Sequence, residues 1–440
     1  MSSEKWRLLN LGRPKFMHSN SHPEITTLQY MGSKSRILKE LCSCFSVFTD
    51  IDTIVDLFAG SGSVGYACKK DKNIISNDIE FYSYVINSAV LNGCLLTPKN
   101  ECLFWEAVDR AFKIRASYFE ELLSVEDNLL NGDDVDAYRK FVEDTPSIFN
   151  LETGSSCFLK LLELSKSIEV GNFKQNNIPF ECLFVTYFAN TYFGFKQCLE
   201  IDAMREQIEK LEDSHVRYVL MAATMAAMSI ASSTTTHFAQ YLKINGKSSF
   251  INLASKRRVS IFETVKDVLK EYRSAGLLNF VAENHKIYNL DFEECLKKIS
   301  VNEKTLIYAD PPYFKEHYSR YYHLLNTFCL YDYPLFSLNP LTKEFSVGRY
   351  RLERNVSDFG RKAKALKAFE RLIACCAKSN AKLVISYSNN SIVKIDDILK
   401  AAKRCFAFVK TNEVDLKHSK QGRSSVSEVE EFIISCWNEE

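Results

Sequence analysis

Long apolar runs, glycine and proline are all scarce in this sequence. Its 440 residues include 15 glycines and 9 prolines, which argues against a low-complexity or largely disordered chain. The most apolar stretch, residues 219–231, is too short to cross a bilayer and predicts a buried helix. We see no apolar block before a cleavage site near the N-terminus, so we expect neither a signal peptide nor a membrane partner. Apolar residues make up 46% of the chain, enough for a sizeable core, and the length predicts two domains.

The 14 cysteines lack any regular spacing. Cys42 and Cys44 are close and Cys375 and Cys376 are adjacent, but no paired CxxC or Cys/His set has the spacing of a zinc site. We therefore expect no metal centre. The cysteines are interpreted as reduced and mostly buried, as in a cytoplasmic protein.

A strong net charge is also missing, since the formal charge is only +1. The charges are nevertheless unevenly placed: residues 343–423 hold 19 Lys and Arg against 8 Asp and Glu, and residues 101–170 hold 7 against 15. Such a distribution suits a protein that holds a polyanion on one face, although a solvated basic helix at 361–371 would look similar. The candidate phosphate contacts, with a solvated basic surface as the alternative, are Lys256, Arg257, Arg258, Arg349, Arg351 and Arg354.

The beginning of the chain alternates between strand and helix signals. Short apolar strands are predicted at residues 54–58 and 73–76, followed by helices that extend to residue 69 and over residues 81–91. This alternation is typical of a parallel sheet.

Residues 103–284 change to a mainly helical pattern, after which strand signals resume. They fall at residues 286–289, 305–308, 382–386, 405–415 and 429–437. The last two flank a polar turn at 417–425 and are typical of an antiparallel hairpin. The simplest arrangement is one α/β domain built from both ends of the chain, with a large helical insertion between them.

A glycine loop follows the first predicted strand. Gly60-Ser61-Gly62-Ser63-Val64-Gly65 fits G-x-G-x-x-G, a pattern that also occurs in nicotinamide dehydrogenases and in turns that only pack a helix on a strand. Asp56 precedes the loop and would repel a pyrophosphate, but it suits the amino group of S-adenosylmethionine. Asp78, at the end of the next strand, is placed to accept hydrogen bonds from a ribose. We therefore favour S-adenosylmethionine over NAD.

Asp310-Pro311-Pro312-Tyr313 follows the apolar strand at 305–308. The two prolines fix the backbone and present the Asp310 carboxylate and the Pro311 carbonyl as acceptors for the two hydrogens of an exocyclic amino group. Tyr313 offers a flat face on which a flipped base could stack. This arrangement predicts amine methylation by electrostatic positioning. The alternative is a proline-capped strand end with an exposed tyrosine.

Three blocks in this order resemble the Dam-like family of adenine-specific DNA methyltransferases. They are Gln29-Tyr30-Met31-Gly32-Ser33-Lys34, the Asp56 to Gly62 loop and the Asp310 tetrapeptide. Ser33 departs from the glycine of many relatives, and the tyrosine-rich stretch 317–323 is longer than the loop of the simplest members. The resemblance implies a cofactor site formed by Tyr30, Lys34, Asp56, Phe58, Ala59, Gly60, Gly62, Asp78, Ile79 and Asp291.

The resemblance also implies the fold class and the organisation of the chain. The fold class is α/β, a Rossmann-like seven-stranded S-adenosylmethionine-dependent methyltransferase sheet with a large, mainly helical inserted domain. Residues 1–96 and 285–440 would form the catalytic domain, and residues 97–284 a target-recognition domain.

The implied reaction is methyl transfer from S-adenosylmethionine to adenine N6 in double-stranded DNA by base flipping, in a restriction-modification or phage-defence setting. Double-stranded DNA and a cognate restriction endonuclease are the implied partners. Cytosine-N4 methylation of DNA, adenine methylation of RNA and a non-catalytic DNA-binding module remain alternatives.

Three residues are expected to contact the substrate. Tyr318 and Arg320 could hold the flipped base and a phosphate, although a helix whose aromatic face packs on the sheet would show the same pattern. Asn389 follows a strand on the ligand side of an open sheet, where the family resemblance places part of the base pocket. A plain strand-ending turn would explain it equally well.

Overall fold

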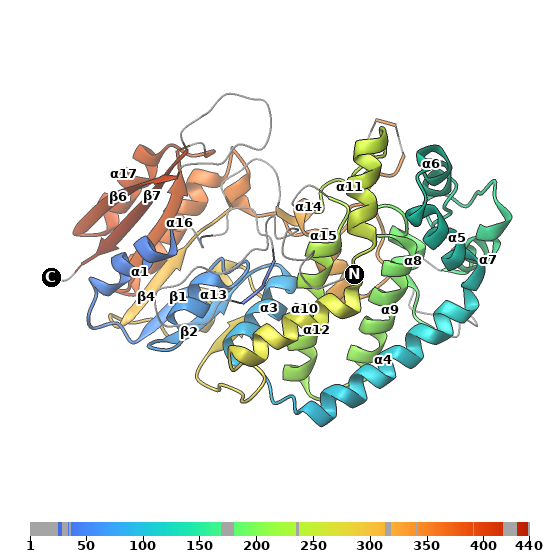
Figure 1. Cartoon of the computed structure of the whole chain (residues 1–440). Coiled ribbons are helices and arrows are strands. Elements are labelled where there is room, and N and C mark those ends of the chain that lie inside the picture. Colours follow the sequence, from blue (N-terminus) through green and yellow to red (C-terminus); the bar gives the residue numbers. More distant parts are fainter. Residues whose placement is uncertain are drawn as a thin grey trace.

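Figure 1 shows the computed structural model of the chain, in which a sheet-containing part and a helical part lie side by side. The structure describes residues 25–28, 34, 37–168, 180–234, 237–312, 318–339, 341–342, 344–389, 391–416 and 429–438. Tyr30, Tyr313 and the predicted polar turn at 417–425 lie outside the described residues.

The sheet has seven strands in the order β3-β2-β1-β4-β5-β7-β6. Its strands are β1 (Thr53–Asp56), β2 (Asn73–Asn77), β3 (Lys286–Tyr288), β4 (Thr305–Ala309), β5 (Lys382–Ser388), β6 (Phe408–Leu416) and β7 (Val429–Trp437). The first five run parallel to their neighbours, and β7 lies antiparallel between β5 and β6. The predicted seven-stranded α/β sheet and its terminal antiparallel hairpin are therefore confirmed.

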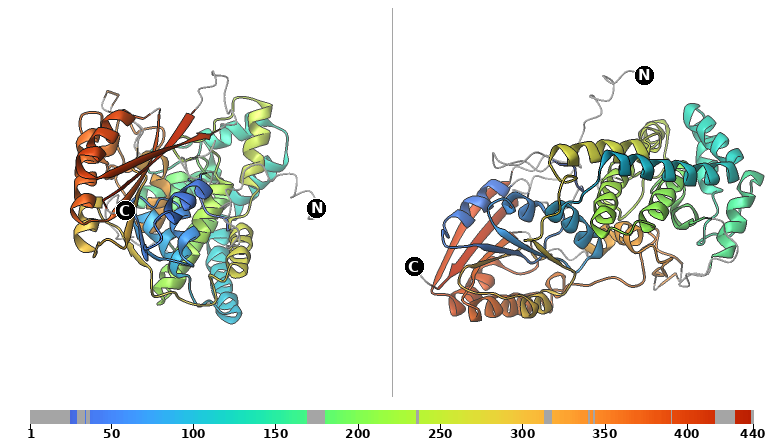
Figure 2. Two further views of the ribbon diagram at one scale, coloured as in Figure 1. Left: turned by 90° about the vertical axis from the view of Figure 1, so that its left-hand side faces the viewer. Right: turned by 90° about the horizontal axis from the view of Figure 1, so that it is seen from below.

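Alternate residues of the strands face two separate apolar cores, as the twofold repeat of a strand requires. In β1, Ile54 faces the core shared with the helical part, and Val55 faces the second core. Figure 2 shows helices on both faces of the sheet. The first face carries α1 (Leu38–Ser46), α2 (Ser63–Cys68) and α3 (Phe81–Asn92), and the second carries α13 (Phe292–Lys298), α16 (Ala365–Lys378) and α17 (Ile395–Cys405).

Between α3 and β3 the described elements are helical. They are α4 (Pro98–Tyr118), α5 (Glu120–Asn131), α6 (Val135–Glu143), η3 (Ser156–Phe158), α7 (Leu159–Ser167), α8 (Leu183–Phe188), α9 (Phe195–Glu209), α10 (Ser214–Ala231), α11 (Lys247–Arg257) and α12 (Ile261–Ser274). The apolar stretch at 219–231 forms most of α10 and is largely buried, as predicted. α10 packs against α3, which ties the helical part to the sheet.

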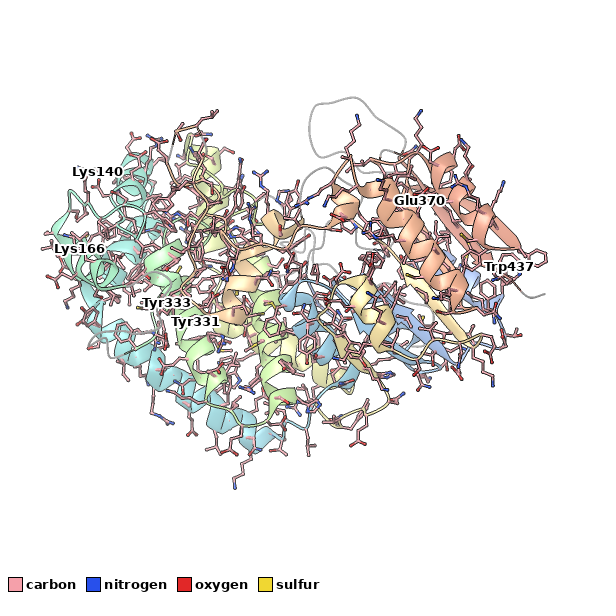
Figure 3. The ribbon with its side chains drawn as sticks, turned by 180° about the vertical axis from the view of Figure 1, so that it is seen from behind. Lys140, Lys166, Tyr331, Tyr333, Glu370 and Trp437 are labelled. Carbon is pink, nitrogen blue, oxygen red and sulfur yellow. The ribbon has the colours of Figure 1, made fainter. Side chains whose placement is uncertain are left out.

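The segment after β4 joins the two parts. It contains α14 (Tyr318–Tyr321), α15 (His323–Leu330) and η4 (Asp358–Gly360), and α15 packs against both α3 and α10. In Figure 3, Tyr331 and Tyr333 lie in the helical part, while Glu370 and Trp437 lie in the part that holds the sheet. Tyr331 and Tyr333, which directly follow α15, thus belong spatially to the helical part, although they come after β4 in sequence.

Two details differ from the sequence predictions. β1 ends at Asp56 and not at residue 58, because the chain turns toward β2, where the Ala59 N–H donates to the Asn77 carbonyl over 3.0 Å. The strand predicted from residue 405 begins at Phe408, because Cys405 is the last residue of α17. All 14 cysteines are free and nine of them are buried, as expected. Among the described residues, no helix combines the length and apolar character needed to cross a membrane.

Candidate active site

The two sequence motifs meet at the carboxyl ends of neighbouring parallel strands. Asp56 is the last residue of β1, and Asp310 directly follows β4, which pairs with β1 in the sheet centre (Figure 1). β2 and β3 lie on the β1 side of this central pair, and β5 lies on the β4 side, so the strand order reverses between β1 and β4. A sheet with such a reversal of strand order opens a ligand crevice at the reversal.

The glycine loop makes a tight turn at this crevice. Gly60 and Gly62 have φ angles of 51° and 76°, in the left-handed region that favours glycine. A Cβ atom on Gly62 would also lie 2.8 Å from the side-chain oxygen of Asn87. The buried Ala59 precedes the turn, and α2 begins directly after Gly62. The loop therefore forms the predicted turn between strand and helix.

A cavity of about 280 Å³ opens beside the two motifs. Six predicted site residues line it: Phe58, Asp78, Ile79, Asp291, Asp310 and Pro312. Further lining residues, which the sequence did not single out, include Glu80, Phe292, Asn355, Asp358, Phe359 and Arg371. Phe58 packs its ring edge-on against Phe359 at 5.3 Å, so one wall of the cavity is apolar and aromatic.

Asp78 holds the shape of the glycine loop. Its two carboxylate oxygens accept the backbone N–H groups of Gly60 and Glu80, each over 2.9 Å. Glu80, two residues later, is buried against the same cavity and accepts from the Asn326 side chain. Burial raises the pKa of Glu80 to about 7. Asp78 and Glu80 therefore place two carboxyl groups side by side at the position where the sequence analysis selected only Asp78.

Asp310 is held from two sides. The Lys34 ammonium lies 2.9 Å from Asp310 Oδ1, and the Ser386 hydroxyl donates to the same oxygen over 3.1 Å. Ser386 Oγ can then accept from the Tyr308 hydroxyl at 2.8 Å. Burial raises the pKa of Asp310 to about 6, although Lys34 and Ser386 oppose this shift. Pro311, next in the motif, is buried.

Lys34 also contacts a carboxylate that the sequence analysis missed. Glu431 on β7 lies 2.7 Å from the Lys34 Nζ atom, and both residues are buried. One cation thus joins two carboxylates from distant parts of the chain. A charged residue within the apolar pattern of residues 429–437 was the available signal for Glu431.

Asp56 is almost completely enclosed. It is 1% exposed, and its Oδ1 atom has no hydrogen-bond partner among the described residues. Burial, together with the nearby Asp310 and Asp78 carboxylates, raises the pKa of Asp56 well above its usual range. A buried carboxylate with an unused acceptor fits a positively charged amino group. The Asp56 carboxylate therefore fits the amino group of S-adenosylmethionine.

Comparison with known proteins identifies the family. Residues 30–400 match the D12 class of N6 adenine-specific DNA methyltransferases. The chain belongs to this family.

Several DNA methyltransferases are similar in sequence to this chain, at low identity. Modification methylase LlaI of Lactococcus lactis subsp. lactis is 26% identical over 88% of this chain and 51% of the relative. Modification methylase StsI of Streptococcus sanguinis is 24% identical over 86% of the chain and 46% of the relative. The chain thus spans about half the length of these two relatives. Type II methyltransferase M.NlaIII of Neisseria lactamica is 23% identical over 86% of the chain and 88% of the relative.

None of the three residues expected to contact the substrate lines the cavity, although Tyr318 and Arg320 flank the lining residue Ser319. Arg320 is exposed on α14, with its guanidinium 4.8 Å from the centre of the Tyr350 ring. Asn389 is exposed directly after β5, and Tyr318 begins α14, while its side chain lies outside the described residues.

Most of the candidate phosphate contacts are instead used within the protein. Arg351 forms a two-point ion pair with Asp332, with one contact of 2.6 Å. Arg257 donates to the Tyr138 hydroxyl over 2.6 Å. Lys256, Arg258 and Arg349 donate to backbone carbonyls of the helical part. Arg257 and Arg351 are buried, so the prediction that they contact DNA is wrong for these two. For Lys256, Arg258 and Arg349, which are not fully buried, contact with DNA stays a prediction. Arg354 differs, because its Nε and Nη1 atoms have no hydrogen-bond partner among the described residues.

Proposed function

We propose that this chain transfers a methyl group from S-adenosylmethionine to N6 of adenine at a specific site in double-stranded DNA, with the target base flipped out of the helix. One observation carries the proposal. The Asp310 carboxylate follows β4, is held by Lys34 and Ser386, and borders the cavity beside the Asp56 loop. This arrangement offers an acceptor for an exocyclic amino group next to a cofactor site.

The residues that line the cavity, together with the enclosed Asp56 next to the lining residue Leu57, would hold the parts of the proposed cofactor. Asp56 would accept from the amino group, and Asp78 and Glu80 would accept from the ribose hydroxyls. Phe58, Ile79 and Phe359 would enclose the adenine ring, and Asp291 would accept from its amino group. When bound, S-adenosylmethionine supplies an electrophilic methyl group on a positively charged sulfur.

Asp310 and the Pro311 carbonyl would each accept one hydrogen of the target amino group. Both hydrogens then point toward acceptors, and the nitrogen lone pair is free to attack. The cofactor sulfur would keep the electron pair of its C–S bond as the methyl group passes to this nitrogen, and the proton that the nitrogen loses would pass to the Asp310 carboxylate. With its pKa at about 6, Asp310 is mainly ionised at neutral pH and so available as an acceptor. Tyr313 would stack on the base.

The rest of the chain suits site-specific work on DNA. We propose residues 97–284 as the target-recognition domain, and Tyr318, Arg320 and Asn389 as substrate contacts. Two relatives are named modification methylases, and a third a type II methyltransferase. These names support a role beside a cognate restriction endonuclease, and we propose that the chain acts in the cytoplasm.

The decisive experiment identifies the methylated nucleoside. The purified chain is incubated with methyl-labelled S-adenosylmethionine and either double-stranded DNA or RNA, and the digested nucleosides are analysed by mass spectrometry. N6-methyl-2′-deoxyadenosine from DNA, absent with the Asp310→Ala variant, supports the proposal. N4-methyl-2′-deoxycytidine would overturn the adenine assignment, and a product only in RNA would overturn the DNA assignment. DNA binding without any labelled product would favour a binding module.

A further inference from the structure

We infer that Arg354 and Arg320, together with the Tyr350 ring that both guanidinium groups contact, form a binding site for one phosphate of the DNA backbone at the mouth of the cavity. The inference rests on the proposed function and deepens it, because it assigns the group that would hold the strand next to the target base. None of the three residues takes part in the chemistry around Asp310.

The Tyr350 ring is a fixed platform. Tyr350 is 6% exposed, and its hydroxyl donates to the Ala239 carbonyl over 2.6 Å. His323 packs edge-on against the ring at 5.2 Å. The guanidinium carbon of Arg320 lies 4.8 Å from the ring centre and that of Arg354 lies 5.4 Å from it. Two cations are therefore gathered on one aromatic side chain that cannot easily move.

The positive charge of this pair is not neutralised within the described part of the chain. Arg354 is half-buried, and its Nε and Nη1 atoms are buried with no hydrogen-bond partner there. Neither arginine forms an ion pair with a described residue, whereas Arg351, three residues before Arg354, is paired with Asp332. The proximity of Arg320 helps to lower the pKa of Arg354, as expected for two like charges.

Unused guanidinium donors in this setting point to an oxyanion. A guanidinium presents its N–H groups in a planar fork that matches two phosphate oxygens, and an aromatic ring beneath it limits the entropy lost on binding. Buried donors without partners destabilise a protein unless a ligand satisfies them. The Glu80 carboxylate attracts the Arg354 guanidinium electrostatically, but it forms no ion pair with it, and its Oε2 atom already accepts from the Asn326 side chain. An external anion is therefore the partner that this site lacks.

The site lies beside the entrance that a flipped base would use. Ser319 and Asn355 both line the cavity together with Asp310. Arg320 follows the first of these residues and Arg354 precedes the second, so each arginine Cα lies about 3.8 Å from the Cα of a cavity-lining residue. α14 lies where the sheet part and the helical part meet (Figure 1). A phosphate bound here would belong to the target strand close to the adenine.

The test compares DNA binding by variants at several salt concentrations, measured by fluorescence anisotropy with a labelled duplex. We expect Arg354→Ala to weaken binding about tenfold and to lower the slope of log Kd against log salt by about 1, equally on duplexes with and without the target site. Arg320→Ala should act in the same direction. Arg354→Lys should retain the slope but lose part of the affinity, because an ammonium lacks the fork. Binding of S-adenosylmethionine should not change.

Arg404→Ala is the matched control, because Arg404 is an exposed arginine on α17 that approaches Glu370 at 3.7 Å. It should leave affinity and salt slope unchanged. A second arm replaces single phosphates near the target adenine by neutral methylphosphonates. One such position should weaken binding of the unaltered chain but not of Arg354→Ala, since the same contact is already lost.

The outcomes separate this inference from the proposed function. Unchanged affinity and slope in both arginine variants, or no methylphosphonate position that is silent in Arg354→Ala, would overturn the phosphate site even if the chain methylates DNA. The expected changes in binding without any methylated product would retain the phosphate site and overturn the proposed reaction.

Discussion

The Nζ atom of Lys34 lies 2.9 Å from Oδ1 of Asp310, where the lysine side chain is 6% exposed and the carboxylate 16%. Glu431 approaches the same ammonium at 2.7 Å. The cation therefore neutralises the buried carboxylate of Glu431 and the largely buried one of Asp310, which borders the cavity. Its removal should affect both the stability of the protein and the ionisation of Asp310.

Lys34→Met should destabilise the protein by about 3 kcal/mol, because it leaves two buried carboxylates without their cation. Methylation at pH 7 should fall at least about a hundredfold, because loss of the cation raises the pKa of Asp310 and leaves the carboxyl group mainly protonated at that pH. Urea unfolding and single-turnover methylation measure the two effects.

The double variant Lys34→Met with Glu431→Gln provides the control for this prediction. It has one buried charge fewer and should be more stable than Lys34→Met alone. Equal stability of the two variants would show that Glu431 does not share the ammonium in solution.

The pH dependence of methylation should report the ionisation of Asp310. Its pKa of about 6 predicts that the rate falls as the pH decreases through about 6, because the protonated carboxyl no longer accepts from the amino group. Ser386→Ala removes a hydrogen bond that lowers this pKa, so the acidic limb should move to higher pH. Glu431→Gln removes a negative charge that raises it, so the limb should move to lower pH.

These shifts are measured from single-turnover rates between pH 5 and pH 9. Exposed Glu353 offers a control, because Glu353→Gln should leave the limb in place. Shifts of the same sign in the two active-site variants would contradict the assignment of this limb to Asp310.

Asp56→Asn should stabilise the free protein while it weakens cofactor binding. Burial raises the folded-state pKa of Asp56 above its unfolded value, so the charged form is disfavoured in the fold. Stability is therefore lost as the pH rises from the unfolded pKa toward the folded one, and the loss remains above it. At pH 8 the neutral amide should raise Tm by roughly 1–3 °C.

The same variant should bind S-adenosylmethionine at least about tenfold more weakly, because the amide neither carries the charge nor offers two acceptors. Differential scanning fluorimetry and titration calorimetry measure the two properties. A lower Tm together with unchanged affinity would contradict the role that we assign to Asp56.

Asp78 and Glu80 should differ when each is replaced by its amide. Asp78→Asn replaces one of two acceptors for backbone N–H groups, so it should lower Tm and disturb the glycine loop. Glu80→Gln retains the side-chain shape and should leave Tm almost unchanged while it raises KM for the cofactor. Thermal melts and steady-state kinetics distinguish them, and identical effects on Tm would argue against separate roles.

Much of the sheet could be predicted from short apolar segments, since a buried strand of a parallel sheet requires a run such as Thr53–Asp56. The glycine loop and the Asp310 motif were also visible, because their geometry depends on adjacent residues. The remaining cavity wall was not. Asn355, Phe359 and Arg371 reach the cavity only because the chain returns from the helical part to the second face of the sheet.

The basic residues show the same limit. Arg351 and Arg354 look alike in the sequence, yet Arg351 meets Asp332 and Arg354 has two buried donors without a partner among the described residues. Composition gives the number of positive charges but not their neighbours. Whether an arginine stabilises the fold or remains available to a ligand depends on contacts between segments that are distant in the chain.

The sequence by itself determined the local geometry of this protein, namely the turn at Gly60 and Gly62 and the rigid Asp310-Pro311-Pro312 strand end, because both depend on neighbouring residues. It also determined the family, because the family depends on the motifs and their order. Only the tertiary structure decided the electrostatics. It brought Lys34 and Glu431 together across the sheet and left one oxygen of Asp56 unbonded within the described residues. The physical reason is that charge interactions depend on distance and burial, and both are set by how remote segments pack.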